Sequence, residues 1–310
     1  MAQLEAPQAP QAPHDHPRRG IETPRGLGGL VRPYSLLDYY LTSVVTGLKA
    51  LRGPHLREAA ARVLNPLSYP RYLEYRLTVN QLCPFDGCRI LDVGSPKLPA
   101  LLLARDQRCE LYVTDIRDYF IDSTADFMRR LGLGQRLGSA IHLEVQDARQ
   151  LTYQEASFDR VYAISVLEHI PHDGDSAAMR EIARVLRPGG FVTLTVPFSG
   201  AGYREEFVRG DVYERRGTGT PTFYQRHYDE ATLRARLIEP SGLRLVSQTL
   251  FGEPGLRFEP LWNRIPMKWK VPLLWLQPFL AQLLFKPLSP ARADAASGVA
   301  LKLEKSPTPP

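Results

Sequence analysis

Acidic and small side chains stand at the ends of three short apolar runs in the middle of the chain. Asp92 and Gly94 close the first run, and Asp115 closes the second, 21 residues after Gly94. At that offset a carboxylate can accept hydrogen bonds from both hydroxyls of a ribose. Asp147 and the small Ala148 follow the third run, where a carboxylate suits the amino edge of an adenine. The spacing therefore predicts a site for a ligand that contains adenosine.

The loop that follows Gly94 argues against a dinucleotide. It continues as Ser95, Pro96, Lys97 and Leu98. A pyrophosphate that lies on a helix N-terminus needs further glycines here, because they let the backbone approach the phosphates closely. The chain lacks them, so the sequence disfavours a nicotinamide-dependent oxidoreductase.

Two histidines are candidates for proton transfer, because an imidazole with an unperturbed pKa near 6.5 can take up a proton near neutrality. His169 ends the stretch Ser165-Val166-Leu167-Glu168-His169 after a fourth apolar run, and His227 lies in the aromatic, polar segment 203–228 after the fifth. His227 has an alternative interpretation, because segment 203–228 could be an ordinary surface loop. The same segment supplies candidate contacts for a substrate, which are Tyr203, Tyr224 and Arg226.

Short apolar runs alternate with amphipathic helical stretches from Arg89 onward. This alternation is typical of a parallel, doubly wound α/β sheet, which binds its ligand beyond the carboxyl ends of its strands. Two further runs near the C-terminus would complete a seven-stranded, Rossmann-like sheet. The expected strands are 89–94, 111–115, 141–145, 160–164, 191–196, 243–249 and 298–303, and the expected helices are 98–105, 123–131, 176–186 and one that Asp229 caps and that runs to Ile238.

The composition divides the chain into five parts. Residues 1–32 are rich in Pro, Gln and Ala and are expected to be a disordered tail, whereas residues 33–82 show helical periodicity and are expected to form an N-terminal cap. Residues 83–250 hold the core of the predicted sheet. An apolar, helical insertion at 251–296, punctuated by prolines, and a last strand with a tail at 297–310 complete the chain.

Five motifs, taken in this order, resemble class I S-adenosylmethionine-dependent methyltransferases of the type 11 group. They are Asp92-Val-Gly94 after a strand, Asp115 at the end of the next, Gln146-Asp147-Ala148, the stretch from Phe158 to Ile170, and the stretch from Met179 to Gly190. The resemblance spans about residues 89–197. It implies a methyltransferase fold, S-adenosylmethionine as cofactor, and an enzyme that methylates a small molecule of lipid-like or glycosyl character.

The resemblance also implies which residues meet which part of the cofactor. The ribose is expected at Asp115 and the adenine at Asp147 and Ala148, with Ile116 as a further cofactor contact. The residues expected to border the methionine part are Asp92, Gly94, Ser95, Ser165 and Val166. In the family that this sequence resembles, the Glu168-His169 pair often holds the loop after the fourth strand, which is the alternative to proton transfer by His169.

Pro96 and Leu98 depart from the family pattern, because they stand at the positions of its second and third glycines. Pro96 also removes a backbone donor from the loop. The alternative to an enzyme is therefore a non-catalytic scaffold that keeps the same fold.

The net charge of +6 comes from 32 arginines and 7 lysines against 33 acidic residues, without a continuous basic run of the kind that follows a phosphate backbone. We therefore expect no nucleic-acid partner. The three cysteines have no ligand spacing to one another or to histidines, which predicts neither a disulfide framework nor a metal site. This cysteine usage is typical of a reducing, cytoplasmic setting.

Segment 260–287 combines all three tryptophans with lysines at its margins. Its apolar stretch is interrupted by prolines and is shorter than the ~20 residues that a membrane span needs. Two interpretations stay open. The segment could make peripheral contact with a membrane interface or cover an apolar acceptor, or it could be a helical subdomain buried against the cap or in a dimer contact. None of these patterns predicts the oligomeric state.

Overall fold

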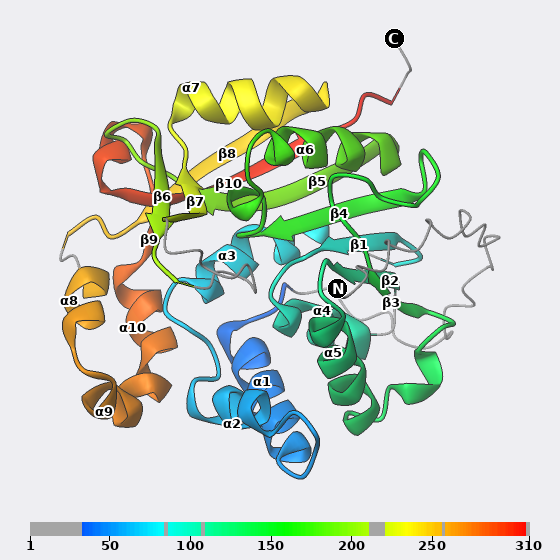
Figure 1. Ribbon diagram of the computed structural model, residues 1–310, viewed down its shortest axis with the longest axis vertical. Helices are drawn as coiled ribbons and strands as arrows, with labels where there is room; N and C mark the ends of the chain where they lie inside the picture. Colours follow the sequence, from blue (N-terminus) through cyan, green and yellow to red (C-terminus); the bar gives the residue numbers. More distant parts are fainter. Residues whose placement is uncertain (1–32, 84–85, 107–108, 211–220, 256–257, 308–310) are drawn as a thin grey trace, which may run out of the picture.

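Figure 1 shows the computed structural model, which describes residues 33–83, 86–106, 109–210, 221–255 and 258–307. The tail predicted at residues 1–32 lies outside these ranges. A large mixed sheet crosses the molecule and carries helices on both faces (Figure 1). The fold is therefore the doubly wound α/β class that the sequence predicts.

The large sheet has the strand order β3-β2-β1-β4-β5-β10-β8-β9. Strands β1 to β5 pair in parallel, whereas β10 is antiparallel to both of its neighbours. The order reverses between β1 and β4, because the chain passes from β1 outward to β3 and then returns to the other side of β1. The strands are β1 (Arg89–Val93), β2 (Glu110–Asp115), β3 (Ile141–Val145), β4 (Phe158–Ile164), β5 (Leu186–Pro197), β8 (Arg244–Gly252), β9 (Lys286–Leu288) and β10 (Ala296–Glu304).

The sequence predicts seven strands in this sheet, and the structure has eight. The additional strand β9 pairs with the outer edge of β8, with Leu288 opposite Leu250. It is three residues long and contains Pro287, so it lacks the pattern by which a strand is recognised. The other seven strands lie where they are predicted. Strand β5 begins before residue 191, because Leu186 already pairs with Phe158 of β4.

Helices cover the two faces of the sheet unequally (Figure 1). Helices α4 (Lys97–Asp106) and α5 (Asp118–Arg130) share one face with the N-terminal helix α1, and α6 (Gly174–Val185) and α7 (Glu230–Leu233) lie on the other. Each face has its own hydrophobic core. Asp229 caps α7 as predicted, and the chain continues into a π-helical turn at Arg234–Ile238.

Three helices precede the first strand: α1 (Leu36–Ala50), α2 (Leu56–Leu64) and α3 (Arg71–Leu77). A capping box begins α1, in which the Ser35 hydroxyl accepts from the Asp38 amide and the Asp38 carboxylate accepts from the Ser35 amide. Helix α3 brings Arg71 and Glu74 to the carboxyl end of β4. The N-terminal helices therefore contribute to the edge of the sheet at which a ligand is expected.

The insertion forms α8 (Phe258–Arg264), α9 (Met267–Lys270), α10 (Gln277–Leu284) and strand β9. It packs on the segment that leads into α3. The Tyr69 amide donates to Gln277 Oε1 at 3.2 Å, the Tyr69 hydroxyl donates to Glu253 at 2.6 Å, and the Tyr69 and Phe285 rings meet at 5.6 Å between centroids. Within the described ranges, every helix is too short or too polar to cross a bilayer.

A separate hairpin of β6 (Arg204–Val208) and β7 (Thr222–His227) stands at the carboxyl edge of the large sheet (Figure 1). It follows β5 in the chain and returns to the sheet through a bridge between Phe198 and Tyr228. The hairpin therefore overhangs the side of the sheet at which β1 and β4 end.

Candidate functional site

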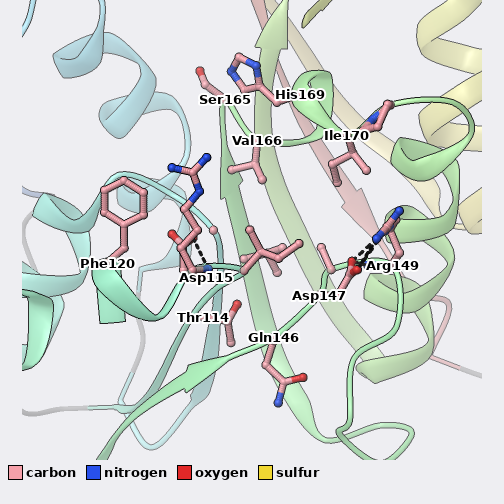
Figure 2. Close-up of a pocket in the computed structure, with 16 residues that line it drawn as sticks. Thr114, Asp115, Phe120, Gln146, Asp147, Arg149, Ser165, Val166, His169 and Ile170 are labelled. Atoms are coloured by element: carbon pink, nitrogen blue, oxygen red, sulfur yellow. Dashed lines mark hydrogen bonds and ion pairs between the residues drawn. The ribbon is translucent and has the colours of Figure 1, made fainter. Parts of the chain in front are cut away.

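A cavity of about 700 Å³ opens where the strand order reverses (Figure 2). The loops after β1, β2, β3 and β4 enclose it, as expected for the ligand site of a doubly wound sheet. Its walls are formed by Val93, Gly94, Thr114, Asp115, Ile116, Arg117, Phe120, Gln146, Asp147, Ala148, Arg149, Ser165, Val166, His169, Ile170 and Pro171.

The loop after β1 requires glycine at position 94. Gly94 has φ +63°, and a Cβ built there would lie 3.1 Å from Val166 Cγ1. Asp92 and Ser95 stand behind this loop, both almost fully buried. The Ser95 amide donates to Asp92 Oδ1 at 3.0 Å, and Ser95 Oγ accepts from the Ile164 amide at 3.0 Å. These two residues thus tie the β1 loop to β4, whereas Gly94 itself faces the cavity.

Asp115, at the end of β2, is held by a lysine that the sequence analysis did not select. Lys97 Nζ lies 2.9 Å from Asp115 Oδ2 and donates to the Thr114 carbonyl at 3.0 Å. The Arg117 amide donates to Asp115 Oδ1 at 3.2 Å. Because a carboxylate has about four acceptor positions, Asp115 retains capacity for further donors.

Asp147 and Arg149 form the opposite rim of the cavity (Figure 2). Arg149 makes an ion pair of 2.6 Å with Asp147, and this hydrogen bonding lowers the pKa of the Asp147 carboxyl. Ile116, Phe120 and Ala148 supply apolar surface to the wall of the same cavity. A flat heterocyclic ring that carries an amino group can pack against such a surface. The Asp147 carboxylate can then accept a hydrogen bond from that amino group.

The end of β4 supplies the other side of the cavity. Ser165 has a positive φ of 51°, which an ordinary side chain rarely adopts. His169 lines the cavity nearby, and its Nδ1 lies 2.9 Å from the Tyr224 carbonyl. Since a carbonyl can only accept, Nδ1 must carry the hydrogen, which leaves Nε2 of the neutral ring as an acceptor. Glu168 is buried beside it, and burial raises the pKa of its carboxyl to about 8.

The residues predicted to contact the methyl acceptor lie in three different surroundings. Tyr224 lies next to the cavity, with its ring 5.2 Å from the His169 ring between centroids. Tyr203 and His227 instead line a second cavity of about 560 Å³, and burial lowers the pKa of His227. Arg226 is fully buried and donates to the carbonyls of the loop after β4, those of Ile170 and His172.

The first cavity thus brings together most of the residues predicted to bind the cofactor. Sequence reasoning missed Lys97, Arg71 and Glu74. Lys97 stands inside the first motif, and a cation at that position is the signal that could have indicated it. Arg71 and Glu74 lie before the first strand, and no local pattern indicates that α3 reaches the end of β4.

The residues fit S-adenosylmethionine on structural grounds. The glycine at 94 leaves room that a Cβ would fill, a carboxylate stands at the ribose offset, and a second carboxylate borders an apolar slot. Among the described residues, no three His, Cys, Asp or Glu side chains gather as metal ligands would.

A family model described as a methyltransferase domain matches residues 91–194. This segment is similar to class I, type 11 methyltransferases. We call this segment the methyltransferase domain, and it contains all four strand ends that enclose the first cavity.

Curated relatives are similar to part of the chain. Methyltransferase GfsG of Streptomyces halstedii is 38% identical over 109 residues, which are 35% of this chain and 37% of that protein. The 27-O-demethylrifamycin SV methyltransferase of Amycolatopsis mediterranei is 30% identical over 52% of this chain and 58% of its own length. The sterol 24-C-methyltransferase of Eremothecium gossypii is 32% identical over 39% of this chain and 30% of its own. The chain thus spans less than two thirds of each of these relatives.

A solved structure shows the same fold beyond the methyltransferase domain. The geranyl diphosphate C-methyltransferase of Streptomyces coelicolor superimposes with a TM-score of 0.50 over 83% of this chain and 85% of that one, at 9% identity. At this identity the likeness concerns the fold alone.

Proposed function

We propose that the protein transfers the methyl group of S-adenosylmethionine to a small, lipid-like or glycosyl acceptor. The observation that carries this proposal is the single cavity at the strand-order reversal, which collects Gly94, Asp115, Asp147 and Ser165 in a methyltransferase domain. In the proposed division of the chain, residues 83–250 form the catalytic core, with the cap at 33–82, the insertion at 251–296 and the last strand at 297–310 as additions.

In this proposal the cofactor lies along the first cavity. Asp115 and Ile116 hold the ribose, and Asp147 and Ala148 hold the adenine. The methionine part borders Gly94, Ser165 and Val166, while Asp92 and Ser95 support the loop beneath it. When bound, the cofactor supplies an activated methyl group with its own leaving group, so the protein acts mainly by holding the acceptor in line.

His169 is the proposed base where the acceptor must lose a proton. Its Nε2 is the acceptor nitrogen of a ring fixed by the Tyr224 carbonyl, and it lines the same cavity as the cofactor residues. His227 is the second candidate, and it would serve an acceptor held in the second cavity. Tyr224 and Tyr203 are the proposed acceptor contacts. Arg226 would act by holding the loop at 170–172 beside the acceptor.

The names of the relatives agree with a small-molecule acceptor, since they include a rifamycin derivative and sterols. A non-catalytic scaffold is not favoured. The loop at Pro96 keeps its shape through the bond from the Ser95 amide to Asp92 and the bond from the Gly94 amide to the Thr114 carbonyl. The backbone N–H group that Pro96 lacks is therefore not needed to form the loop.

Calorimetric titration with S-adenosylhomocysteine tests the proposed cofactor site. We expect the wild type to bind and Asp115→Asn to lose most of the affinity, because the amide offers the ribose hydroxyls only one acceptor oxygen. Asp122→Asn, an exposed acidic residue of α5, is the matched control and should bind as the wild type does. Wild-type protein that binds no S-adenosylhomocysteine would favour the scaffold.

We further propose that segment 260–287 makes peripheral contact with an anionic membrane. Trp269, Trp275, Phe279 and Leu283 of this segment are exposed. The Tyr40 ring of α1 lies 6.1 Å from the Trp275 ring between centroids, so the exposed face of α1 continues this surface. That face consists of Leu37, Leu41, Val45 and Leu48.

The charge of the segment favours lipid over a second copy of the chain. Residues 260–288 contain Arg264, Lys268, Lys270 and Lys286 and no acidic residue. A two-fold dimer through this face would bring these cations together, whereas an anionic headgroup layer neutralises them. Tryptophans beside lysines are typical of a membrane interface.

Co-sedimentation tests this contact with vesicles of phosphatidylcholine alone and vesicles that also contain phosphatidylserine. We expect binding to the mixed vesicles that is lost on replacing both Trp269 and Trp275 by serine. Val246→Ser, which removes an exposed apolar side chain of β8, should leave it unchanged. No binding to either vesicle, or a dimer that the double substitution dissociates, would overturn the membrane contact.

A further inference from the structure

The second cavity, of about 560 Å³, lies where separate segments of the chain meet beyond the carboxyl end of β5. Its walls are the loop at 198–204 after β5, Glu253 after β8, the segment 294–297 at the start of β10, and His227 at the end of β7. Among the described residues, none lines both this cavity and the first one. The two cavities can therefore be occupied at the same time.

Close backbone contacts define the shape of this cavity. A Cβ at Gly200 would lie 2.5 Å from the Ala293 carbonyl oxygen, so the loop after β5 needs a glycine where it passes this segment. The Phe198 amide donates to the Ser297 carbonyl at 3.0 Å. The cavity is thus enclosed by segments that are tied to one another through the backbone.

The wall carries charges of both signs. Glu253 and Asp294 are acidic and Arg204 is basic. Burial lowers the pKa of His227, which is therefore neutral near pH 7. Two carboxylates would repel an anionic ligand, and the guanidinium would repel a cationic one. A ligand without net charge, which both donates and accepts hydrogen bonds, fits this wall best.

The polar groups of the wall complement one another. Glu253 is 7% exposed, and its Oε1 accepts from the Tyr69 hydroxyl at 2.6 Å. Because a carboxylate has about four acceptor positions, Glu253 can also accept from a ligand. Asp294 offers a second carboxylate from another segment, whereas Arg204 offers only donors. Hydroxyl groups, each with one hydrogen and two lone pairs, can pair with both kinds of partner.

Apolar surface lies beside these polar groups. It comes from Phe198, Ala201, Ala295 and Ala296. A pyranose ring has hydroxyls around its rim and C–H groups on its faces, so it matches a wall of this mixed character. A purely apolar chain would instead remove the charged groups from water without replacing their hydrogen bonds. The volume falls within the ~300–1,000 Å³ that is usual for small-molecule sites.

We propose that the second cavity binds a neutral sugar unit of the acceptor, with Glu253 and Asp294 accepting from its hydroxyls and Arg204 donating to its oxygens. This inference rests on the proposed function and narrows the acceptor to the glycosyl class. Tyr224, next to the first cavity, and His227 are three positions apart in β7, which is roughly 10 Å along a strand. One acceptor can therefore extend from the second cavity to the first.

Saturation-transfer NMR on the full chain tests this binding without any turnover. The probes are the methyl α-glycosides of glucose, mannose and galactose, with putrescine as a cationic and citrate as an anionic comparison. We expect at least one glycoside to bind at millimolar concentration. Excess S-adenosylhomocysteine should leave its signal unchanged, because the proposed cofactor cavity is separate.

Two substitutions distinguish a sugar from a charged ligand. For a sugar, Arg204→Ala and Asp294→Ala should each weaken binding by roughly 10-fold, because each removes a charge-assisted hydrogen bond. For a cation, Arg204→Ala would instead strengthen binding, and for an anion Asp294→Ala would do so. Both side chains are exposed, so both variants should fold. Arg209→Ala and Asp122→Ala, at exposed positions outside both cavities, are the matched controls and should bind as the wild type does.

The sugar site and the proposed function can fail separately. The inference is overturned if none of the three glycosides binds, if S-adenosylhomocysteine displaces the bound one, or if putrescine or citrate binds in its place with the opposite response to substitution. Protein that binds a glycoside but no S-adenosylhomocysteine would keep the sugar site and lose the proposed methyl transfer. Binding of S-adenosylhomocysteine without any glycoside would do the reverse.

Discussion

Lys97 and Asp115, a residue that lines the cavity, form an ion pair of 2.9 Å, and both side chains are largely buried. The lysine comes from the first turn of α4 and the aspartate from the end of β2. The pair therefore fixes the position of the carboxylate that is proposed to hold the ribose. Lysine at 97 lies within the motif that departs from the family's glycine pattern.

Replacing Lys97 by methionine should destabilise the protein by about 2–4 kcal/mol, because removing one partner leaves a poorly solvated carboxylate without its cation. Urea denaturation measures this free energy of unfolding. Lys49→Met, the same change at an exposed position of α1, should shift it by less than about 0.5 kcal/mol. Equal effects of the two substitutions would show that the buried pair contributes nothing to stability.

Replacing Gly94 by alanine should abolish cofactor binding and lower stability by about 1–2 kcal/mol, since it places a side chain at a positive φ and against Val166. Gly138→Ala is the matched control. It has φ +78°, and its Cβ would meet no atom within 4 Å. Gly138→Ala should therefore lose a similar free energy of unfolding through its positive φ, but it should keep the affinity for S-adenosylhomocysteine. The prediction fails if Gly94→Ala binds normally.

The Glu168 carboxyl makes stability depend on pH in a defined direction. Its pKa is about 8 in the folded protein and 4.5 in an exposed reference state. Between these values the unfolded chain releases the proton and the folded protein keeps it, so wild-type stability falls as pH rises from about 4.5 to 8.

Glu168→Gln removes this contribution. Its free energy of unfolding should decline less than that of the wild type between pH 5 and pH 8.5, and the difference is at most about 5 kcal/mol. Asp92, whose pKa burial raises to about 6, contributes the same trend to both proteins and cancels in the comparison. Parallel pH profiles for the two proteins would contradict a buried, protonated Glu168.

His169→Asn tests proton transfer, because the Asn amide can still donate to the Tyr224 carbonyl while the basic nitrogen is lost. With labelled S-adenosylmethionine and an extract that contains the acceptor, product formation should fall by roughly 10²-fold or more. Affinity for S-adenosylhomocysteine should stay within about threefold. His227→Asn is the comparison, and a larger loss there would assign the base to the second cavity.

The parallel part of the sheet could be predicted because its strands are short apolar runs that alternate with helical stretches, and several of them end at a polar or acidic residue that can contact a ligand. The same logic found Asp115 and Asp147, since the carboxyl ends of parallel strands meet at one edge. Strand β9 could not be found in this way, because its pairing depends on where the insertion places Pro287 and Leu288.

The sequence did not predict which way side chains point or which distant residues come into contact. Nothing in the segment 203–228 indicates that Arg226 turns inward to the carbonyls of Ile170 and His172 while Tyr203 and His227 line another cavity. Likewise, Arg71 and Ser165 are 94 positions apart, and only the packing of α3 brings them together.

The placement of α3 joins the proposed cofactor site to the segment proposed to contact a membrane. Tyr69, just before the helix, makes hydrogen bonds to Gln277 and Glu253 of the insertion. Arg71 and Glu74, within the helix, make hydrogen bonds to Ser165, which lines the cavity. Occupation of the two sites is therefore subject to thermodynamic linkage through one short helix. Any factor by which lipid changes the affinity for the cofactor must equal the factor by which the cofactor changes the affinity for lipid.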